Sequence, residues 1–176
     1  MCGYSADVRA RAVILLLAIV LFAAGCQYPD DVDGTLDRVR DGGTLRVGVS
    51  EEEPYVILDA ARPRGVEVRL VTGFAAQQRA GVRYERGGEE SLVERLHGGE
   101  LDIVIGGVTS RNPAKKQVAP TRPYAETSTE IGGEQVTQKH VMFVRAGENA
   151  MLVALERYLL NREEQIRRML AEAGER

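Results

Sequence analysis

The chain has 176 residues, of which 44% are hydrophobic and 28% are charged. This length suits one ordinary domain rather than two, and the composition is that of a globular protein, not of a disordered tail or a coiled-coil rod. The formal net charge of -3, without a long basic run, excludes the electrostatic character of a nucleic-acid-binding protein. Two Cys and two His are too few for an ordinary structural zinc site, so we predict no metal.

The amino terminus has the form of an export signal. Residues 12–24 are uncharged, rich in Ile, Leu and Val, and preceded by two arginines. This stretch spans roughly 20 Å as a helix, short of the ~30 Å hydrocarbon core of a bilayer. Ala23-Ala24-Gly25-Cys26 resembles a bacterial lipobox, which implies cleavage before Cys26 and a lipid thioether on its sulfur. We therefore predict a lipoprotein signal peptide over residues 1–25; an uncleaved anchor and a plain signal peptide remain the alternatives.

The lipid anchor would place the rest of the chain outside the inner membrane, in the periplasm or at the cell surface. Residues 26–40 are then a tether, because Gln27–Gly34 is polar and contains Pro29 and three Asp. The domain is predicted over residues 41–176. No disulfide is expected, because Cys2 leaves with the signal and Cys26 carries the lipid.

Strands and helices alternate along the exported part. Hydrophobic periodicity predicts, in chain order, a strand over 44–49, a helix within 65–78, a strand over 81–86, a helix over 89–96 and a buried strand over 101–105. This order predicts an α/β fold with a mostly parallel sheet flanked by helices. Ligands of such sheets gather beyond the carboxyl ends of the strands, here after Val49 and Ile105. A further strand over 140–144 and a helix from Glu148 follow a polar surface connection.

Short motifs over residues 43–124 carry a family resemblance. In order, they are Thr44–Val49, Pro54-Tyr55, Gly65–Leu70, Leu92–Leu96, Gly99–Thr109 and Arg122–Tyr124. Together they resemble the bacterial solute-binding proteins of family 3, with the type 2 periplasmic-binding fold, which deliver amino acids and other small polar solutes to ABC importers. Members carry a second lobe after the last motif, but here only residues 125–139 precede the returning strand. Fifteen residues cannot form a lobe, so we predict a single lobe of this fold.

The resemblance also implies a ligand site at the strand ends. It places Tyr55 against the ligand, and Thr109 and Ser110 after the apolar strand offer hydroxyls and free N–H groups to an anion. Arg111 is a candidate anion anchor. The family's ligand-holding arginine aligns with Ala114, which leaves binding of an α-amino acid open. For each residue the alternative is an ordinary packing, capping or solvated role.

The chain shows no nucleophile elbow, zinc-protease motif or phosphate-binding loop. We therefore predict that it is not an enzyme and has no cofactor. The leading function is the binding of a small polar or anionic, amino-acid-like solute for an ABC permease. A single lobe offers half the walls of a closed site. The alternative is thus an interaction or sensory module that docks on another protein, or on a second copy, through the former ligand face. A remnant without ligand is the third possibility.

Overall fold

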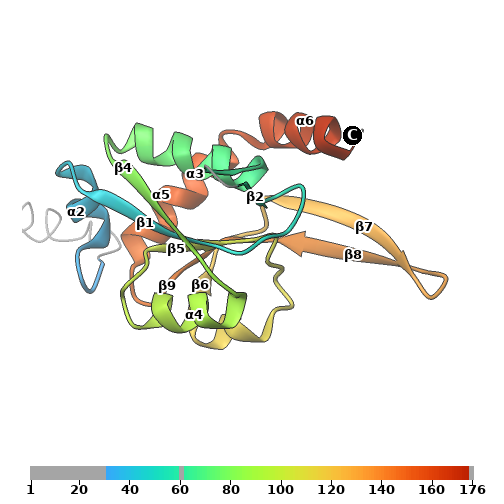
Figure 1. Cartoon of the computed structure of the whole chain (residues 1–176), viewed down its shortest axis with the longest axis horizontal. Helices are drawn as coiled ribbons and strands as arrows, with labels where there is room; N and C mark the ends of the chain where they lie inside the picture. The colour runs from blue at the N-terminus through green and yellow to red at the C-terminus, as the bar shows by residue number, and fades with distance from the viewer. Residues whose placement is uncertain (1–30, 60–61, 175–176) are drawn as a thin grey trace, which may run out of the picture. The chain divides into compact units, whose positions relative to one another are not determined.

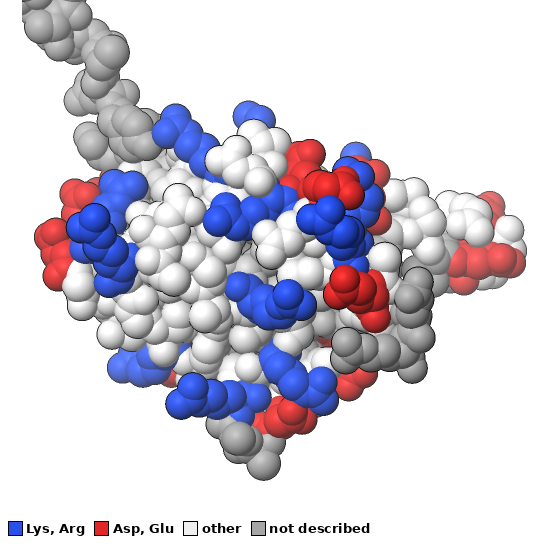
Figure 2. Space-filling view, turned by 90° about the horizontal axis from the view of Figure 1, so that it is seen from above, with Lys and Arg blue, Asp and Glu red and all other residues white. Residues whose placement is uncertain are grey.

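A computed structural model of the chain describes residues 31–59 and 62–174. The predicted signal peptide and the predicted lipidation site, Cys26, lie outside these residues. No helix within the described ranges is both long enough and apolar enough to cross a membrane. On the face in Figure 2, Lys and Arg side chains are spread across the middle and Asp and Glu side chains lie mainly toward the left and right, so both signs of charge are present on this surface.

A five-stranded sheet forms the centre of the domain (Figure 1). Its strands, in spatial order, are β4 (Gly81–Arg86), β1 (Thr44–Val49), β5 (Ile103–Ile105), β9 (Phe143–Arg145) and β6 (Val118–Pro120). Strand β1 pairs in parallel with both β4 and β5, whereas β9 runs antiparallel to β5 and β6. The predicted α/β fold with a mostly parallel sheet is confirmed.

Helices cover both faces of this sheet. Leu45, Val47 and Val49 of β1 point into one core with α3 (Val66–Gln77), α5 (Asn149–Leu160) and α6 (Glu163–Gly174). Val104 of β5 points to the opposite core, which α4 (Glu89–His97) covers. Strand β5 is buried on both faces, which explains its continuous apolar sequence.

The domain begins before residue 41, within the predicted tether. Residues 35–40 form helix α2 (Thr35–Arg40), and its Leu36 and Val39 are buried in the core. Two carboxylates fix this helix to the start of α5. Asp31 accepts hydrogen bonds from the backbone N–H groups of Leu36 and Met151, and Glu148 accepts those of Asp33 and Thr35. Residues 31–40 are therefore part of the fold rather than a solvated linker.

The connection in place of a second lobe is a β-hairpin. Strands β7 (Ala125–Ile131) and β8 (Glu134–His140) pair along their whole length around the two-residue turn Gly132-Gly133. Both glycines have positive φ, 63° and 87°, as two-residue hairpin turns require. Figure 1 shows the hairpin extending away from the helix-covered sheet. The short strands β2 (Ile57–Leu58) and β3 (Pro63–Arg64) and the 3₁₀ helix η1 (Pro113–Lys116) complete the described elements.

Candidate functional site

The candidate site lies where β1 and β5 end, at one edge of the sheet. The backbone turns sharply after β5 through Gly106 and Gly107, whose φ angles are 152° and 65°. A Cβ atom on Gly106 would lie 2.8 Å from Ser50 Cβ, and one on Gly107 would lie 2.6 Å from Glu52 Cγ and 2.9 Å from Tyr55 Cδ2. The two strand-end segments therefore touch only because glycine stands at both positions.

Glu67, in the first turn of α3, is fully buried beneath this turn. Its Oε2 accepts the N–H groups of Gly106 at 2.7 Å and Gly107 at 3.0 Å, and its Oε1 accepts the Tyr124 hydroxyl at 2.6 Å. Burial raises the pKa of Glu67 to about 7, although these three donors act in the opposite direction. An acid with this pKa would suit proton transfer, but Glu67 is sealed in the core, so its role is to hold the turn.

His140, at the end of β8, is the second buried titratable group. Its Nδ1 lies 3.2 Å from the Gly107 carbonyl oxygen, which can only accept, so Nδ1 carries the proton. The single lone pair of Nε2 then accepts a hydrogen bond from one of the Tyr55 and Thr127 hydroxyls, whose oxygens each lie 2.8 Å away. Burial lowers the pKa of His140, which favours this neutral form. The histidine thus joins the hairpin base to the strand-end turn.

The four predicted site residues lie at one edge of the sheet, but they differ in burial and in hydrogen bonding. Tyr55 is 6% exposed; its ring stacks on His140 at 4.4 Å between ring centroids, and its hydroxyl is bonded there. Thr109 and Ser110 are half-buried beside the end of β8, and the Ser110 N–H, predicted to be free, donates to Lys139 O at 2.8 Å. Arg111 is exposed at the rim.

Sequence reasoning missed Glu67 and assigned His140 only a structural role at the start of a strand. The sequence does contain a pattern that predicts a buried Glu67. Glu67 precedes Leu70, Val71 and Phe74 by three, four and seven residues, so it lies on the buried stripe of its helix. An acid at such a position needs internal hydrogen-bond donors. For His140, no signal in the sequence marked the contact with Gly107, which depends on the tertiary fold.

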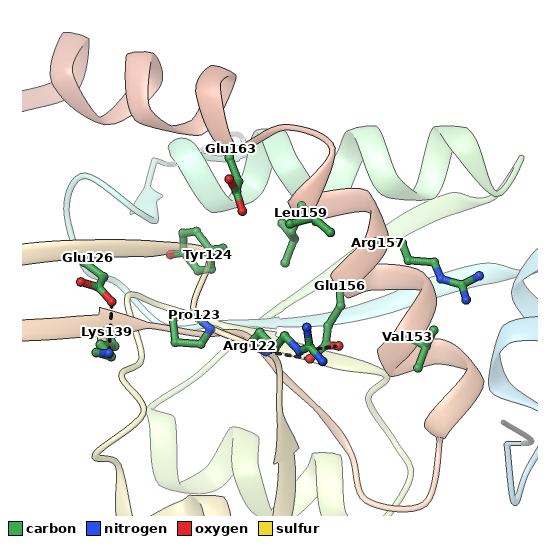
Figure 3. Close-up of a pocket in the computed structure, with 11 residues that line it drawn as sticks. Arg122, Pro123, Tyr124, Glu126, Lys139, Val153, Glu156, Arg157, Leu159 and Glu163 are labelled. Carbon is green, nitrogen blue, oxygen red and sulfur yellow. Dashed lines mark hydrogen bonds and ion pairs between the residues drawn. The ribbon is translucent and has the colours of Figure 1, made fainter.

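A pocket of about 630 Å³ lies on another side of the hairpin base (Figure 3). Its apolar walls are Pro123, Tyr124, Val153, Leu159 and Leu160, and its charged lining residues are Arg122, Glu126, Lys139, Glu156, Arg157 and Glu163. A second pocket of about 400 Å³ shares Tyr124 and Glu163 with it, and a third of about 380 Å³ lies between Arg64 and Met169. Tyr55, Thr109, Ser110 and Arg111 line none of these three pockets. Within the described ranges, no group of three His, Cys, Asp or Glu residues could hold a metal ion.

The chain matches one protein family and a set of curated relatives. The family model of the bacterial extracellular solute-binding proteins, family 3, matches residues 45–169. Membrane-bound lytic murein transglycosylase F from Vibrio parahaemolyticus is 25% identical over 126 residues, which are 70% of this chain and 24% of that protein. The protein of the same name from Photobacterium profundum is 31% identical over 102 residues, 56% of this chain and 20% of that protein. The chain thus spans less than a quarter of these relatives' length.

These relatives contradict the prediction that the chain is not an enzyme, because they carry the name of one, a lytic murein transglycosylase. The prediction rested on missing catalytic motifs in this sequence. That argument says nothing about the enzymes in which a similar domain occurs.

Similar solved structures show the same fold. The ancestral amino acid-binding protein AncCDT-1 matches with a TM-score of 0.68 at 15% identity, over 79% of this chain and 99% of that one. The arginine-bound form of domain 1 from TmArgBP gives 0.59 at 23% identity, over 71% and 98%. An arginine-specific periplasmic binding protein from Salmonella typhimurium gives 0.64 at 15% identity, over 75% and 99%. The single-lobe interpretation agrees with these matches and with the hairpin at residues 125–140.

Proposed function

Because the chain belongs to family 3 of the bacterial extracellular solute-binding proteins, we propose that its domain binds a small polar or anionic, amino-acid-like solute outside the cytoplasm. The observation that carries this proposal is the family match over residues 45–169, which includes both strand ends and the turn after β5. The solute would lie at the carboxyl ends of β1 and β5, where ligands of such sheets gather.

Hydroxyls and cations at the rim support an anionic group in the solute. Thr109 and Ser110 follow β5. The Lys115 Nζ donates to the carbonyl oxygen of Ser110, the residue before Arg111, at 3.2 Å, so Lys115 brings a second cation to this segment. A guanidinium can hold a carboxylate with two parallel hydrogen bonds. Glu52, next to Gly107, supplies a carboxylate for an amine. Tyr55 would support the site from beneath by holding His140, not by offering its hydroxyl.

A single lobe leaves the solute open to water on one side, so its affinity should be lower than in a closed clamp. The arginine-bound form of domain 1 from TmArgBP supports binding by one lobe, because there a single domain of this fold holds its ligand. The finer parts of the proposal are a lipid anchor at Cys26, a periplasmic or cell-surface location, and delivery of the solute to an ABC permease.

The curated relatives favour a second candidate. Since they are named murein transglycosylase F, the second candidate is a domain that serves murein cleavage instead of import: it would bind a soluble murein fragment and pass that signal to a protein partner. This is the sensory form of the docking alternative.

A ligand screen tests both candidates. Thermal unfolding of the purified chain would be followed with single amino acids, organic acids, short peptides and soluble murein fragments, and each hit would be quantified by calorimetry. Stabilisation by a small amino-acid-like or anionic solute supports the first candidate. Stabilisation by murein fragments alone supports the second. A chain that no solute stabilises would contradict both.

A further inference from the structure

Between residues 134 and 138, no strand in the described part of the chain pairs with the outer edge of β8. Strand β8 belongs to a two-stranded sheet in which β7 is its only partner among the described strands. Beyond residue 138 the outer edge is used, because Ser110 N–H donates to Lys139 O and Val141 N–H donates to Val108 O. Backbone groups alternate sides along an antiparallel strand. The N–H and C=O groups of Gln135 and Thr137 therefore point outward with those of Lys139.

The two strands of the hairpin differ in their surroundings. Strand β7 lies along α6: its residues Ala125 and Thr127 line one pocket together with Ile166 and Leu170 of that helix, and Ala125 packs against the main core. The edge of β8 carries Glu134, Gln135 and Thr137 exposed and Val136 half-buried. Soluble proteins usually protect such edges with charged side chains, especially Lys, with Pro or with a bulge. Residues 134–138 contain one charge, Glu134, and neither Lys nor Pro.

We propose that this edge of β8 pairs antiparallel with the same edge of a second copy of the chain, so that the two hairpins form one four-stranded sheet. A two-fold axis at Val136 would place Gln135 of each copy opposite Thr137 of the other. Because the backbone groups of both residues point outward, the two pairs supply four hydrogen bonds. The interaction is isologous, as in most homodimers.

The side chains at this register are compatible with self-pairing. Val136 meets its own copy at the axis, in a pair without backbone hydrogen bonds, where side chains approach most closely. Glu134 faces Gln138, whose amide can donate to the carboxylate. The edge of β7 is less available, because Ala125 and Thr127 line a pocket together with residues of α6. Exposure thus selects the edge of β8, and this register favours a second copy as its occupant.

Substitutions that place charges opposite one another at the contact test the proposed strand register. Sedimentation of the purified full chain should show a monomer–dimer equilibrium that depends on concentration, since an interface of two strands is small. The double variant Gln135→Lys with Thr137→Lys places Lys opposite Lys and should weaken dimerisation at least tenfold. The matched variant Gln135→Lys with Thr137→Glu changes the same positions but places Lys opposite Glu, so it should dimerise at least as well as the original chain.

A cysteine scan provides a second measurement that does not depend on dimer stability. Under mild oxidation, Val136→Cys should form a disulfide-linked dimer, because two-fold pairing brings residue 136 opposite itself. Gln138→Cys is the control, since its partner in this register is Glu134, and it should not cross-link above the background of the original chain. A chain that stays monomeric at all concentrations, or equal cross-linking of both variants, would overturn the proposal. Dimerisation that survives the Lys–Lys variant would do the same.

Discussion

Glu67 and His140 both hydrogen-bond the backbone of Gly107. Glu67 Oε2 accepts the Gly107 N–H at 3.0 Å, and His140 Nδ1 donates to the Gly107 carbonyl at 3.2 Å. The first residue belongs to α3 and the second ends the hairpin, so one residue of the strand-end turn connects a helix with the element that replaces a second lobe. The shape of the proposed solute face therefore depends on two buried titratable groups.

In the Glu67→Gln variant, the free energy of unfolding should no longer fall as the pH rises through neutrality. Because the pKa of Glu67 is raised to about 7, the folded state retains a proton that the unfolded state releases near its ordinary pKa of 4.5. The stabilisation is fully present below about pH 4.5 and is lost as the pH rises through 7, by about 3 kcal/mol at 1.36 kcal/mol per unit. Gln keeps an acceptor for the two glycine N–H groups and a donor for Tyr124, so urea unfolding of this variant should lack that decline.

His140 provides the internal control for the same measurement. Burial lowers its pKa, so its contribution is present above the ordinary value of 6.5 and is lost as the pH falls from there through the lowered pKa of the folded state. The Glu67→Gln variant should keep this acid-side loss. If it also keeps the neutral-side decline, Glu67 is not the group responsible.

Tyr124→Phe should destabilise the domain by about 1–3 kcal/mol, because it leaves the buried Glu67 Oε1 without its hydroxyl donor. Since that hydrogen bond lowers the pKa of Glu67, its loss should move the neutral-side decline to higher pH. Tyr84→Phe is the matched control. Its hydroxyl bonds the Thr72 hydroxyl at 2.7 Å in an exposed position, so the free energy of unfolding should change by less than about 1 kcal/mol. Equal losses in both variants would contradict the role given to the Tyr124–Glu67 bond.

The central sheet was predictable because its strands carry strong patterns. Strands β1 and β4 begin and end at the predicted residues 44–49 and 81–86, since apolar residues alternate in both. The hairpin was not expected: its residues are polar on both faces, so hydrophobic periodicity is weak, and only the Gly132-Gly133 pair marked the turn. Helix α2 was placed in the tether because its apolar positions, Leu36 and Val39, are only two.

The position of the candidate residues at the strand ends was predictable, but their hydrogen bonds were not. Strand order located the edge after Val49 and Ile105, where Tyr55, Thr109 and Ser110 are found. Which polar groups at this edge remain free to bind a ligand depends on hydrogen bonds between segments that are distant in the sequence. The hydroxyl of Tyr55 and the N–H of Ser110 are taken by residues 140 and 139 of the hairpin, which no local pattern places beside them.

Arg111→Ala should weaken binding of an anionic solute by about ten- to a hundredfold, the value of one charge-assisted contact of 1.5–3 kcal/mol. The free energy of unfolding should not change, because Arg111 is exposed. Arg122→Ala is the matched control: it removes another exposed arginine, one that lines the 630 Å³ pocket. Calorimetry with the same solute measures both. Loss of binding in Arg122→Ala alone would move the site from the strand ends to that pocket.

Asp102→Asn should cost about 2–4 kcal/mol of stability. The carboxylate is 1% exposed and accepts from Arg38 Nη2 at 2.7 Å, Arg46 Nη2 at 2.5 Å and the Arg46 N–H at 2.8 Å. Neutralising it leaves two guanidinium groups beside a buried amide, although their partial exposure limits the cost. Asp59→Asn breaks an exposed ion pair with Arg64 and should cost less than about 1 kcal/mol. Similar unfolding midpoints for the two variants would show that Asp102 does not serve folding.

The start of the domain can be tested first by substitution of Asp31 and then by truncation. Asp31 Oδ1 accepts the Met151 N–H at 2.9 Å and Oδ2 accepts the Leu36 N–H at 2.7 Å, so one side chain serves the first turns of both α5 and α2. Asp31→Ala should therefore cost about 1–3 kcal/mol, as the loss of a helix cap does. Asp37→Ala is the control, since it removes an exposed acid of the same helix.

A chain that begins at residue 41, the predicted start of the domain, should lose more than the Asp31→Ala variant. It lacks the buried side chains of Leu36 and Val39, and removing large core side chains typically costs 2–5 kcal/mol each. A chain that begins at residue 31 should unfold at the same urea concentration as the full chain. If both truncated chains are equally stable, residues 31–40 belong to the tether after all, and the carboxylate contacts of Asp31 and Glu148 contribute nothing measurable.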